Sequence, residues 1–262
     1  MNNTELLATA RNLAVSAGEL LRKGFGGSFG VSSKEGRHNL VTEYDNRSED
    51  LIISGIRRKF PDHEFLAEES GASGNTDSNV RWIIDPLDGT VNFAHSIPIF
   101  CVSIAAEVGG EIECGVIYQP MTDEMFTTIK DGGAFLNDKP LRVSQNTKLN
   151  DAILVTGFPY NVGSNPDNCI EHFSAFLRFG IPIRRLGSAA LDLAYTAAGR
   201  FDGFWEARLN PWDVAAGMLM VREAGGRISS YDNSEYKIGD KSIVASNGHI
   251  HGEILDVLYS VR

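Results

Sequence analysis

The chain has 262 residues, a formal net charge of −10 and a hydrophobic content of 42%, which is ordinary for a soluble globular protein. This acidic balance, with a pI near 5.1, excludes general nucleic-acid binding, because that function requires a basic face. The three cysteines have no Cys-x-x-Cys spacing and therefore predict neither a disulfide framework nor a zinc site. We accordingly expect a cytoplasmic protein without a signal peptide, and no apolar run approaches the roughly 18 residues of a membrane span.

The N-terminal part predicts two helices separated by a glycine-rich segment. Apolar residues recur at helical spacing over residues 4–23, and again over residues 46–59, where Asp45 is the expected N-cap. Residues 24–36 predict a mobile loop or an irregular hairpin, because their glycines fit neither a P-loop nor a dinucleotide-binding fingerprint. Residues 71–79 are rich in Gly, Ser, Asn and Asp, which is typical of a surface loop.

The rest of the chain divides into a strand-rich part and an alternating part. Three apolar segments of strand length and a hairpin indicate an antiparallel sheet, at residues 100–108, 113–119, 125–130 and 132–141. Strands and helices then alternate, with strands at 153–156, 183–185, 201–206 and 243–245 and helices at 167–179, 188–198, 213–224 and 250–261. We therefore expect an α+β fold, formed by a single domain over residues 1–262 with two packed halves at roughly 1–145 and 146–262.

One stretch, residues 82–90, reads Trp-Ile-Ile-Asp-Pro-Leu-Asp-Gly-Thr and combines an apolar run with two acids. The run predicts a buried strand, and the Pro and Gly after it favour a sharp turn that aims Asp85 and Asp88 at one point. Converging carboxylates repel each other unless a cation intervenes, and Mg2+ favours carboxylates, water and phosphate oxygens. The alternative is that both acids only form the turn, because Asp, Pro and Gly dominate turns.

Two further motifs accompany this stretch. Residues 65–70, Phe-Leu-Ala-Glu-Glu-Ser, place paired acids after a short apolar segment, and residues 210–217, Asn-Pro-Trp-Asp-Val-Ala-Ala-Gly, place Asp213 at the head of a helix. Together, over about residues 45–226, the three motifs resemble the inositol monophosphatase family of Mg2+-dependent, lithium-sensitive phosphatases. The resemblance implies a layered α-β-α-β-α sandwich, a homodimer and two or three Mg2+ ions per active site. It also implies hydrolysis of myo-inositol monophosphate or a related phosphorylated polyol by metal-activated water.

The resemblance assigns the metal ligands residue by residue. The expected ligands of one ion are Glu68, Asp85 and the backbone carbonyl of Leu87. A second ion is expected at Asp85, Asp88 and Asp213, and a third, weaker one near Glu68. The acid that follows Glu68 diverges from it on an extended chain, and the resemblance selects Glu68 of the two. Helix capping is the alternative role of Asp213, and capping and ligation are compatible.

Catalytic and substrate-binding roles follow in the same way. Thr90 is expected to hydrogen-bond the attacking water, Glu68 to help remove its proton, and Asp45 to act beside Thr90, with helix capping as its alternative role. Lys34 falls where the resemblance places a lysine near the site. Residues 187–190 open a helix whose N–H groups suit phosphate or polyol oxygens. The full set of expected substrate contacts is Asp88, Gly89, Thr90, Gly187, Ser188, Ala189, Glu206 and Asp213.

Other activities share these motifs and remain alternatives. They are fructose-1,6-bisphosphatase, a dual-specificity enzyme, and 3′-phosphoadenosine 5′-phosphate phosphatase. A different class of alternative is a regulatory protein that keeps the fold and docks on a macromolecule, although no expected ligand is missing from the chain. Trp205 and Trp212 are expected in the core or at an interface, and His95 on the surface or in a loop rather than at a metal ion.

Overall fold

The computed structural model describes residues 3–34 and 39–261. Within these ranges, the α-helices are α1 (Asn3–Gly24), α2 (Glu43–Lys59), α3 (Thr90–Ala94), α4 (Cys169–Arg178), α5 (Ala189–Ala197), α6 (Pro211–Glu223) and α7 (His251–Tyr259). Short 3-10 helices are found at Leu149–Asp151, Val162–Ser164 and Pro166–Asn168. None of the described helices is long and apolar enough to span a lipid bilayer.

The strands form a hairpin and two larger sheets. The hairpin pairs β1 (Val31–Ser33) with β2 (Leu40–Thr42). An eight-stranded sheet has the order β10-β9-β8-β7-β6-β5-β3-β4 and is antiparallel except for the β3–β5 pair. Its strands are β3 (Glu64–Ala67), β4 (Gly71–Gly74), β5 (Val80–Asp88), β6 (Cys101–Val108), β7 (Glu111–Gln119), β8 (Glu124–Ile129), β9 (Gly133–Leu136) and β10 (Lys139–Pro140).

The second large sheet is mixed. It has the order β12-β11-β13-β15-β14, and β11 runs parallel to both of its neighbours, whereas the remaining pairs are antiparallel. Its strands are β11 (Leu154–Thr156), β12 (Ile183–Arg184), β13 (Gly203–Ala207), β14 (Arg227–Ser229) and β15 (Ser242–Ser246). Parallel pairing of β11 with β13 brings the carboxyl ends of these two strands to the same edge.

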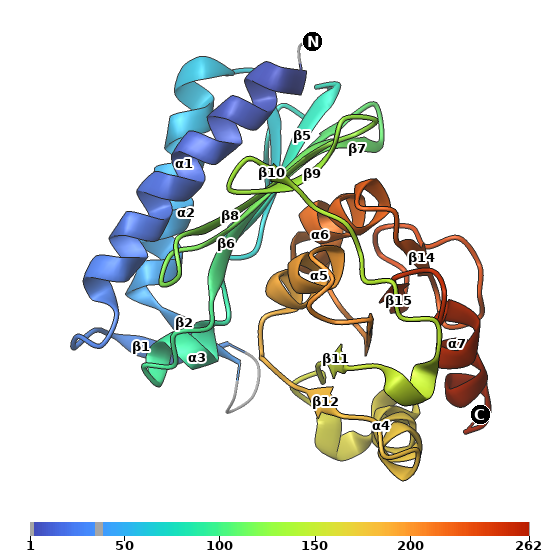
Figure 1. The fold of residues 1–262 in the computed structure, drawn as a ribbon. Coiled ribbons are helices and arrows are strands. Elements are labelled where there is room, and N and C mark those ends of the chain that lie inside the picture. Colours follow the sequence, from blue (N-terminus) through green and yellow to red (C-terminus); the bar gives the residue numbers. More distant parts are fainter. Residues whose placement is uncertain (1–2, 35–38, 262) are drawn as a thin grey trace.

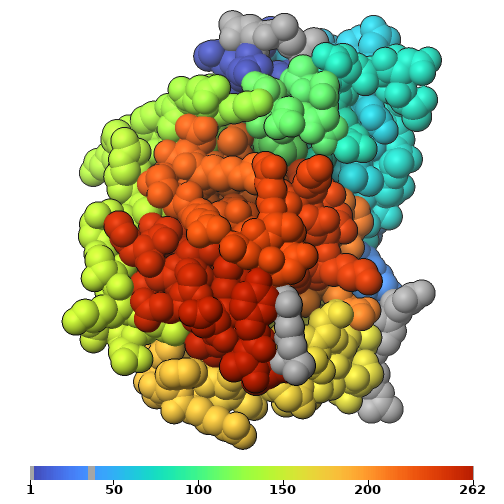
Figure 2. All heavy atoms as spheres, turned by 90° about the vertical axis from the view of Figure 1, so that its right-hand side faces the viewer, coloured from blue at the N-terminus to red at the C-terminus, as the bar shows by residue number. Residues whose placement is uncertain are grey.

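Helices and sheets alternate in layers (Figure 1). Helices α1 and α2 cover one face of the eight-stranded sheet, α5 and α6 lie between the two sheets, and α4 and α7 cover the outer face of the five-stranded sheet. This α-β-α-β-α sandwich confirms the expected α+β fold class. In Figure 2 the orange to red segments of the second half occupy the centre of the face, with the yellow-to-gold segment that precedes them below and cyan and green segments of the first half above.

The composition of the helices explains the layer that each occupies. Helix α6 is buried continuously from Val214 to Val221, as expected of a helix that is apolar on every side and lies between two layers. It approaches the sheet so closely that a Cβ on Gly115 of β7 would lie 2.8 Å from the Ala216 Cα. Helix α1, by contrast, buries one stripe at helical spacing and exposes the other side. That stripe consists of Leu6, Ala10, Ala14, Ala17 and Leu21.

Three local expectations differ from the structure or are refined by it. Helix α2 begins at Glu43 with Thr42 as its N-cap, and Asp45 is its third residue, so the expected cap at Asp45 was wrong. Residues 71–74 form edge strand β4 rather than a loop, because main-chain pairing with β3 needs no strand-forming side chains. Of residues 24–36, only Val31–Ser33 form a strand, and it pairs with β2, which lies after this range, so the hairpin alternative is met in part; positions 35 and 36 lie outside the described residues.

Candidate active site

Asp85 and Asp88 lie near the end of β5, where the strand contains a bulge. Asp85 pairs with Ser103 and Asp88 with Cys101 of β6, so three steps along β5 match two steps along β6. Residues three apart on a regular strand point to opposite faces, and the extra residue removes this alternation. The bulge therefore turns both carboxylates toward one side without the sharp turn that we expected. Gly89 follows with a φ of +99°, which glycine adopts without strain.

Glu68 directly follows β3 and is held beside Asp85. Its N–H donates to the Ile84 carbonyl at 3.1 Å, which continues the parallel register of β3 with β5. The Glu49 carboxylate of α2 accepts the N–H groups of the next two residues, both at 2.9 Å, and so fixes this turn. The Lys34 ammonium donates to Glu68 at 3.0 Å and to the adjacent acid at 2.6 Å. Lys34 thus neutralises part of the charge on this side of the site.

The N-terminal end of α5 binds Asp88. Oδ2 of Asp88 accepts hydrogen bonds from the Ser188 hydroxyl at 2.7 Å and from the Ala190 N–H at 2.8 Å. The Cys101 thiol lies 3.8 Å from the same oxygen. We expected the first N–H groups of this helix to be available to substrate, but the Ala190 N–H already has Asp88 as its partner. A hydroxyl and a helix amide therefore stabilise the charged form of Asp88 in place of a cation.

Asp213 is the third residue of α6 and contributes to its capping. Its Oδ2 accepts the N–H of Asn210 at 2.6 Å. The start of α6 is attached to the first sheet, because the Ser103 hydroxyl donates to the Trp212 carbonyl at 3.4 Å. Capping uses only one carboxylate oxygen of Asp213. The structure is therefore compatible with both expected roles of Asp213, helix capping and metal ligation.

The four acids lie within one another's electrostatic fields. Burial raises the pKa of Asp85 well above its ordinary value, and the charges of the other three acids raise it further. Burial also raises the pKa of Asp88 to about 6, against the opposing effect of its hydrogen bonds. The pKa of Asp213 is raised by burial and then by the charge of Asp88. The pKa of Glu68 is raised by burial, which the charge of Lys34 partly offsets.

This cluster fits a hard divalent cation by its chemistry. Carboxylate and carbonyl oxygens are the ligands that Mg2+ prefers, and a dication would relieve the repulsion that raises these pKa values. Across residues 3–34 and 39–261, no three His, Cys, Asp or Glu side chains already stand in a chelating arrangement. The acids are instead bound to protein donors such as Lys34 and Ser188, which ligation would have to replace.

Thr90 and Asp45 form a buried pair beside the bulge. The Thr90 hydroxyl lies 2.7 Å from Asp45 Oδ1 and 3.0 Å from the Leu87 carbonyl oxygen, and its single proton can be donated to only one of them. The other oxygen of Asp45 accepts from the Thr42 N–H at 2.8 Å and from the Thr42 hydroxyl at 2.6 Å. Asp45 therefore stabilises the start of α2 and orients Thr90 at the same time.

Glu206 lies on β13, where a glycine makes room for it. A Cβ on Gly157 would lie 2.3 Å from either carboxylate oxygen of Glu206. Burial raises the pKa of Glu206 to about 8, and the charge of Asp213 adds to the effect. Its carboxyl is accordingly a hydrogen-bond donor at neutral pH in the metal-free protein. Gly187, with a φ of +85°, precedes α5 in the same region of the fold.

Two side chains that we had not singled out also shape the site. Asn92 donates to the Ile99 carbonyl at 2.7 Å and to the Leu186 carbonyl at 2.8 Å, and so joins the loop before α5 to the first half. Asp192 of α5 is buried, and burial and nearby acids raise its pKa well above its ordinary value. Asp192 could have been found from the sequence, because it is a charged residue within the otherwise apolar run of α5. The sequence offered one hint for Asn92, namely its position just after the central motif. It could not reveal the Leu186 carbonyl as a hydrogen-bond partner, because that residue is distant in the sequence.

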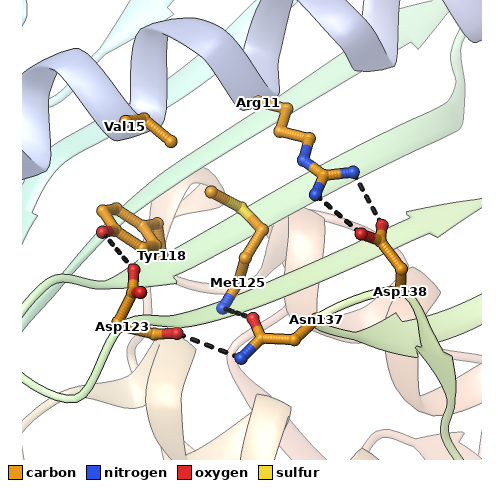
Figure 3. Close-up of a pocket in the computed structure, with 7 residues that line it drawn as sticks. All are labelled: Arg11, Val15, Tyr118, Asp123, Met125, Asn137 and Asp138. Carbon is orange, nitrogen blue, oxygen red and sulfur yellow. Dashed lines mark hydrogen bonds and ion pairs between the residues drawn. The ribbon is translucent and has the colours of Figure 1, made fainter.

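A surface hollow elsewhere does not share this chemistry. Figure 3 shows the hollow of about 260 Å3 between α1 and the first sheet, in which the charged side chains point toward one another. Arg11 binds Asp138 through two hydrogen bonds of 2.7 and 3.0 Å, and the Tyr118 hydroxyl donates to Asp123 at 2.8 Å. These charged groups are satisfied by each other, and the carboxylate cluster remains the candidate site.

The fold and the converging acids define the class of protein, and comparison with known proteins agrees. The chain is a phosphoric monoester hydrolase of the layered α+β type. A family model described as the inositol monophosphatase family matches residues 2–261, almost the whole chain. The chain belongs to the inositol monophosphatase family.

Individual relatives show how far the similarity extends. The chain is 44% identical to an inositol-1-monophosphatase of Mesorhizobium japonicum, over 97% of this chain and 96% of that protein. It is 43% identical to the Nus factor SuhB of Escherichia coli K12, over 94% of this chain and 92% of that protein. The solved inositol monophosphatase of Anabaena superimposes with a TM-score of 0.90 at 41% identity, covering 100% of this chain and 98% of that structure.

Proposed function

We propose that this protein is a Mg2+-dependent phosphatase that hydrolyses myo-inositol monophosphate or a closely related polyol phosphate. The observation that carries the proposal is the gathering of Glu68, Asp85, Asp88 and Asp213 beside a strand bulge, where burial and the charges of neighbouring acids in this group raise the pKa values of Asp85, Asp88 and Asp213. A charge cluster of this kind, partly exposed and reached from several elements, is typical of a functional site. The names of relatives such as the Mesorhizobium inositol-1-monophosphatase support the substrate class.

The proposed metal ligands come from both halves of the chain. They are Glu68, Asp85, the Leu87 carbonyl, Asp88 and Asp213, and they would hold two or three Mg2+ ions. When bound, Mg2+ neutralises the phosphate charge and makes hydroxide available near neutral pH. Because Asp213 belongs to α6 and the other ligands to the first sheet, the site requires both halves to stay packed together. We therefore propose that residues 1–262 act as a single domain.

The protein's own groups would then control the attacking water. By donating its proton to Asp45, the Thr90 hydroxyl is left with lone pairs that accept a hydrogen bond from that water. Glu68 would take the water's proton, since its pKa is raised above the ordinary carboxylate value. Thr90 orients the water and Glu68 removes the proton, so no Ser-His-Asp triad is needed.

Substrate binding would use the backbone after β5 and the edge of the second half. The N–H groups of Gly89 and Thr90 at the start of α3 suit phosphate oxygens. The leaving polyol would contact Gly187, Ser188, Ala189 and Glu206. The buried Glu206 carboxyl would hydrogen-bond a polyol hydroxyl, which distinguishes a polyol from an apolar leaving group.

The decisive experiment measures phosphate release from a panel of esters with Mg2+ and with chelator. We expect Mg2+-dependent hydrolysis with the largest kcat/KM on myo-inositol 1-phosphate. A larger kcat/KM on fructose 1,6-bisphosphate or 3′-phosphoadenosine 5′-phosphate would assign one of the alternative activities instead. Comparable values for the inositol and fructose substrates would indicate dual specificity. Absence of hydrolysis from every ester would overturn the proposal.

A regulatory role is the second candidate, because one relative is named Nus factor SuhB. A macromolecular partner would bind the folded surface whether or not catalysis occurs. Affinity capture with an Asp88→Asn variant separates the two roles: a partner captured equally by variant and wild type would depend on the fold and not on turnover. Under either role we propose a cytoplasmic, lithium-sensitive homodimer, which light scattering and a lithium titration of the activity would check.

A further inference from the structure

The buried face of α2 changes from polar to apolar along the helix. Its buried residues recur at helical spacing, at positions 45, 48, 49, 52, 53 and 56. The last three are isoleucines that pack in the core, whereas the first three are Asp45, Ser48 and Glu49. A buried polar side chain destabilises a fold unless it is hydrogen-bonded, so the partners of these three residues show what this half of the helix does.

Each of the three polar side chains contacts a different segment around the carboxylate cluster. Asp45 Oδ1 lies 2.7 Å from the Thr90 hydroxyl. The Ser48 hydroxyl donates to the Pro86 carbonyl at 2.8 Å, inside the bulge of β5. Glu49 reaches the turn that follows β3. The first half of α2 therefore lies along the proposed metal site, and the second half along the core.

Glu49 binds two consecutive main-chain amides. Its Oε2 accepts the Glu69 N–H and its Oε1 accepts the Ser70 N–H, each at 2.9 Å. Glu49 is only 4% exposed, and no described Lys, Arg or His residue forms an ion pair with it. Because a buried carboxylate is costly without a partner, these two amides provide most of its solvation. Both carboxylate oxygens of Glu49 are thus used to hold the backbone.

The two hydrogen bonds restrain the direction of the Glu68 side chain. The Glu69 N–H belongs to the peptide group that links Glu69 to Glu68. The N–H of Glu68 itself donates to the Ile84 carbonyl of β5 at 3.1 Å. The peptide groups on both sides of Glu68 are therefore hydrogen-bonded, one to the sheet and one to α2. Because φ and ψ are the only soft dihedrals of the backbone, this arrangement restrains the direction of the Glu68 Cα–Cβ bond.

The adjacent acid makes this restraint important. Lys34 Nζ lies 3.0 Å from a Glu68 carboxylate oxygen and 2.6 Å from one of Glu69, so one ammonium contacts both side chains. The two acids have the same chemistry, and a rotation of the peptide group between them would change which of them lies at the site. Glu49 opposes that rotation, since it holds the N–H of this peptide group and of the next one.

We propose that Glu49 is a positioning residue for metal binding, which holds the turn after β3 so that the Glu68 carboxylate, and not that of Glu69, is directed at the proposed Mg2+ site. The inference rests on the proposed phosphatase function and adds to it a residue that touches neither metal nor substrate. A ligand that is restrained before the ion arrives loses less conformational freedom on binding. Replacing a residue that orients a metal ligand typically weakens metal binding. The effect of Glu49 should therefore appear in the affinity for Mg2+.

The test is a calorimetric titration of the substrate-free protein with MgCl2, in wild type, Glu49→Gln and Glu49→Asp. Glutamine keeps the length of the side chain but presents an NH2 group to one of the two amides. Aspartate keeps the charge but is one methylene shorter. We expect the Mg2+ concentration at half-saturation to rise by about tenfold in both variants. Hydrogen exchange of the Glu69 and Ser70 amides should be faster in both.

Phosphate release provides a second measurement on the same proteins. The Mg2+ concentration that gives half of the maximal rate should also rise by about tenfold, because the same ions are bound. At saturating Mg2+, KM for myo-inositol 1-phosphate should stay within about twofold of wild type, since Glu49 does not contact the substrate.

Glu223→Gln is the matched control, because Glu223 makes the same pair of contacts away from the site. It accepts the N–H groups of Asp131 and Gly133, both at 2.9 Å, in the turn between β8 and β9. Along α6 it lies about 15 Å from Asp213. The substitution should lower the melting temperature without changing the Mg2+ concentration at half-saturation.

An unchanged half-saturation in both Glu49 variants would overturn the inference while the phosphatase proposal stands. A wild-type value in Glu49→Asp alone would also overturn it, because the charge and not the hydrogen bonds would then be responsible. An equal shift in Glu223→Gln would assign the effect to lost stability, which again removes the positioning role. A wild type that neither binds Mg2+ nor hydrolyses any ester would instead overturn the proposed function and this inference with it.

Discussion

The Ser188 hydroxyl at the start of α5 donates a hydrogen bond of 2.7 Å to Oδ2 of Asp88 at the end of β5, across 100 positions of the sequence. Asp88 is only 9% exposed, so the hydroxyl and the neighbouring Ala190 amide provide most of its solvation. The metal-free protein thus partly neutralises a buried ligand with the positive end of a helix. The same contact joins the two halves of the chain at the point where the metal ligands meet.

The first prediction concerns Asp88→Asn. The amide has nearly the same shape and still accepts the hydrogen bonds of α5, but it removes one anionic ligand. We expect turnover to fall by at least about a hundredfold while the metal-free melting temperature is unchanged or rises, because a repelling charge is lost. Phosphate release and thermal melting measure the two effects. Asp138→Asn, which alters a carboxylate paired with Arg11 on the surface, is the control and should keep full activity.

The second prediction is a loss of metal-free stability as the pH rises. Glu206 has its pKa raised from 4.5 to about 8, so the folded state binds this proton more tightly than the unfolded chain does. Its stabilising contribution is complete below about pH 4.5 and disappears as the pH rises through about 8. Asp88, with a pKa raised to about 6, acts in the same direction over the lower part of this range.

Chemical denaturation of the protein in the presence of a metal chelator, at a series of pH values, tests whether stability falls as the pH rises. The free energy of unfolding should decrease between about pH 5 and pH 9, and Glu206→Gln should flatten the upper part of that decrease. Added Mg2+ should restore stability at high pH, because it binds the ionised ligands of the folded state. A metal-free stability that increases over the same range would contradict the raised pKa values.

The third prediction concerns Gly157→Ala. The new methyl group would lie 2.3 Å from the Glu206 carboxylate oxygens, so Glu206 must move away from its present position. We expect KM for the polyol ester to rise by about tenfold and stability to fall by about 1–3 kcal/mol. Gly163→Ala is the matched control in the segment after β11, since no atom lies within 4 Å of its added Cβ. If both variants changed KM and stability by similar amounts, the space that Gly157 leaves for Glu206 would not affect substrate binding.

The parts of the site that could be predicted from sequence are those in which a short motif carries its own chemistry. Asp85, Asp88 and Asp213 stand beside local signals for a strand or a helix start, and both elements were found, although β5 continues through Asp88 and α6 begins at Pro211. The bulge was not predictable, because it depends on pairing with β6, which no local pattern encodes. The same limit applies to the Asn92 hydrogen bonds, since the Leu186 carbonyl lies 94 positions away. Thr42 and Asp45 are both suitable N-cap residues and lie within four positions of each other. Thr42 is the N-cap, because its hydroxyl accepts the Tyr44 N–H.

The last prediction separates the orienting role of Thr90 from its structural role. The Thr90 hydroxyl lies within hydrogen-bonding distance of Asp45 and the Leu87 carbonyl, and Thr90→Val removes it without changing the shape of the side chain. We expect kcat to fall by about a hundredfold, with a stability loss of about 1–3 kcal/mol because Asp45 loses a buried partner. Thr90→Ser keeps the hydroxyl and should retain most of the activity.

A control variant with a similar loss of stability shows whether the fall in kcat of Thr90→Val is only an effect of destabilisation. Thr128→Val removes another buried threonine hydroxyl, which donates to the Gly133 carbonyl at 3.2 Å in the first sheet, far along the chain from the proposed ligands. It should lose a similar amount of stability but keep its kcat, because its hydroxyl orients no reacting group. If Thr90→Val and Thr128→Val reduced kcat equally, the hydroxyl of Thr90 would act only through folding, and the water-orienting role would be wrong. A drop in kcat confined to Thr90→Val, restored in Thr90→Ser, is the outcome that the Asp45–Thr90 hydrogen bond leads us to expect.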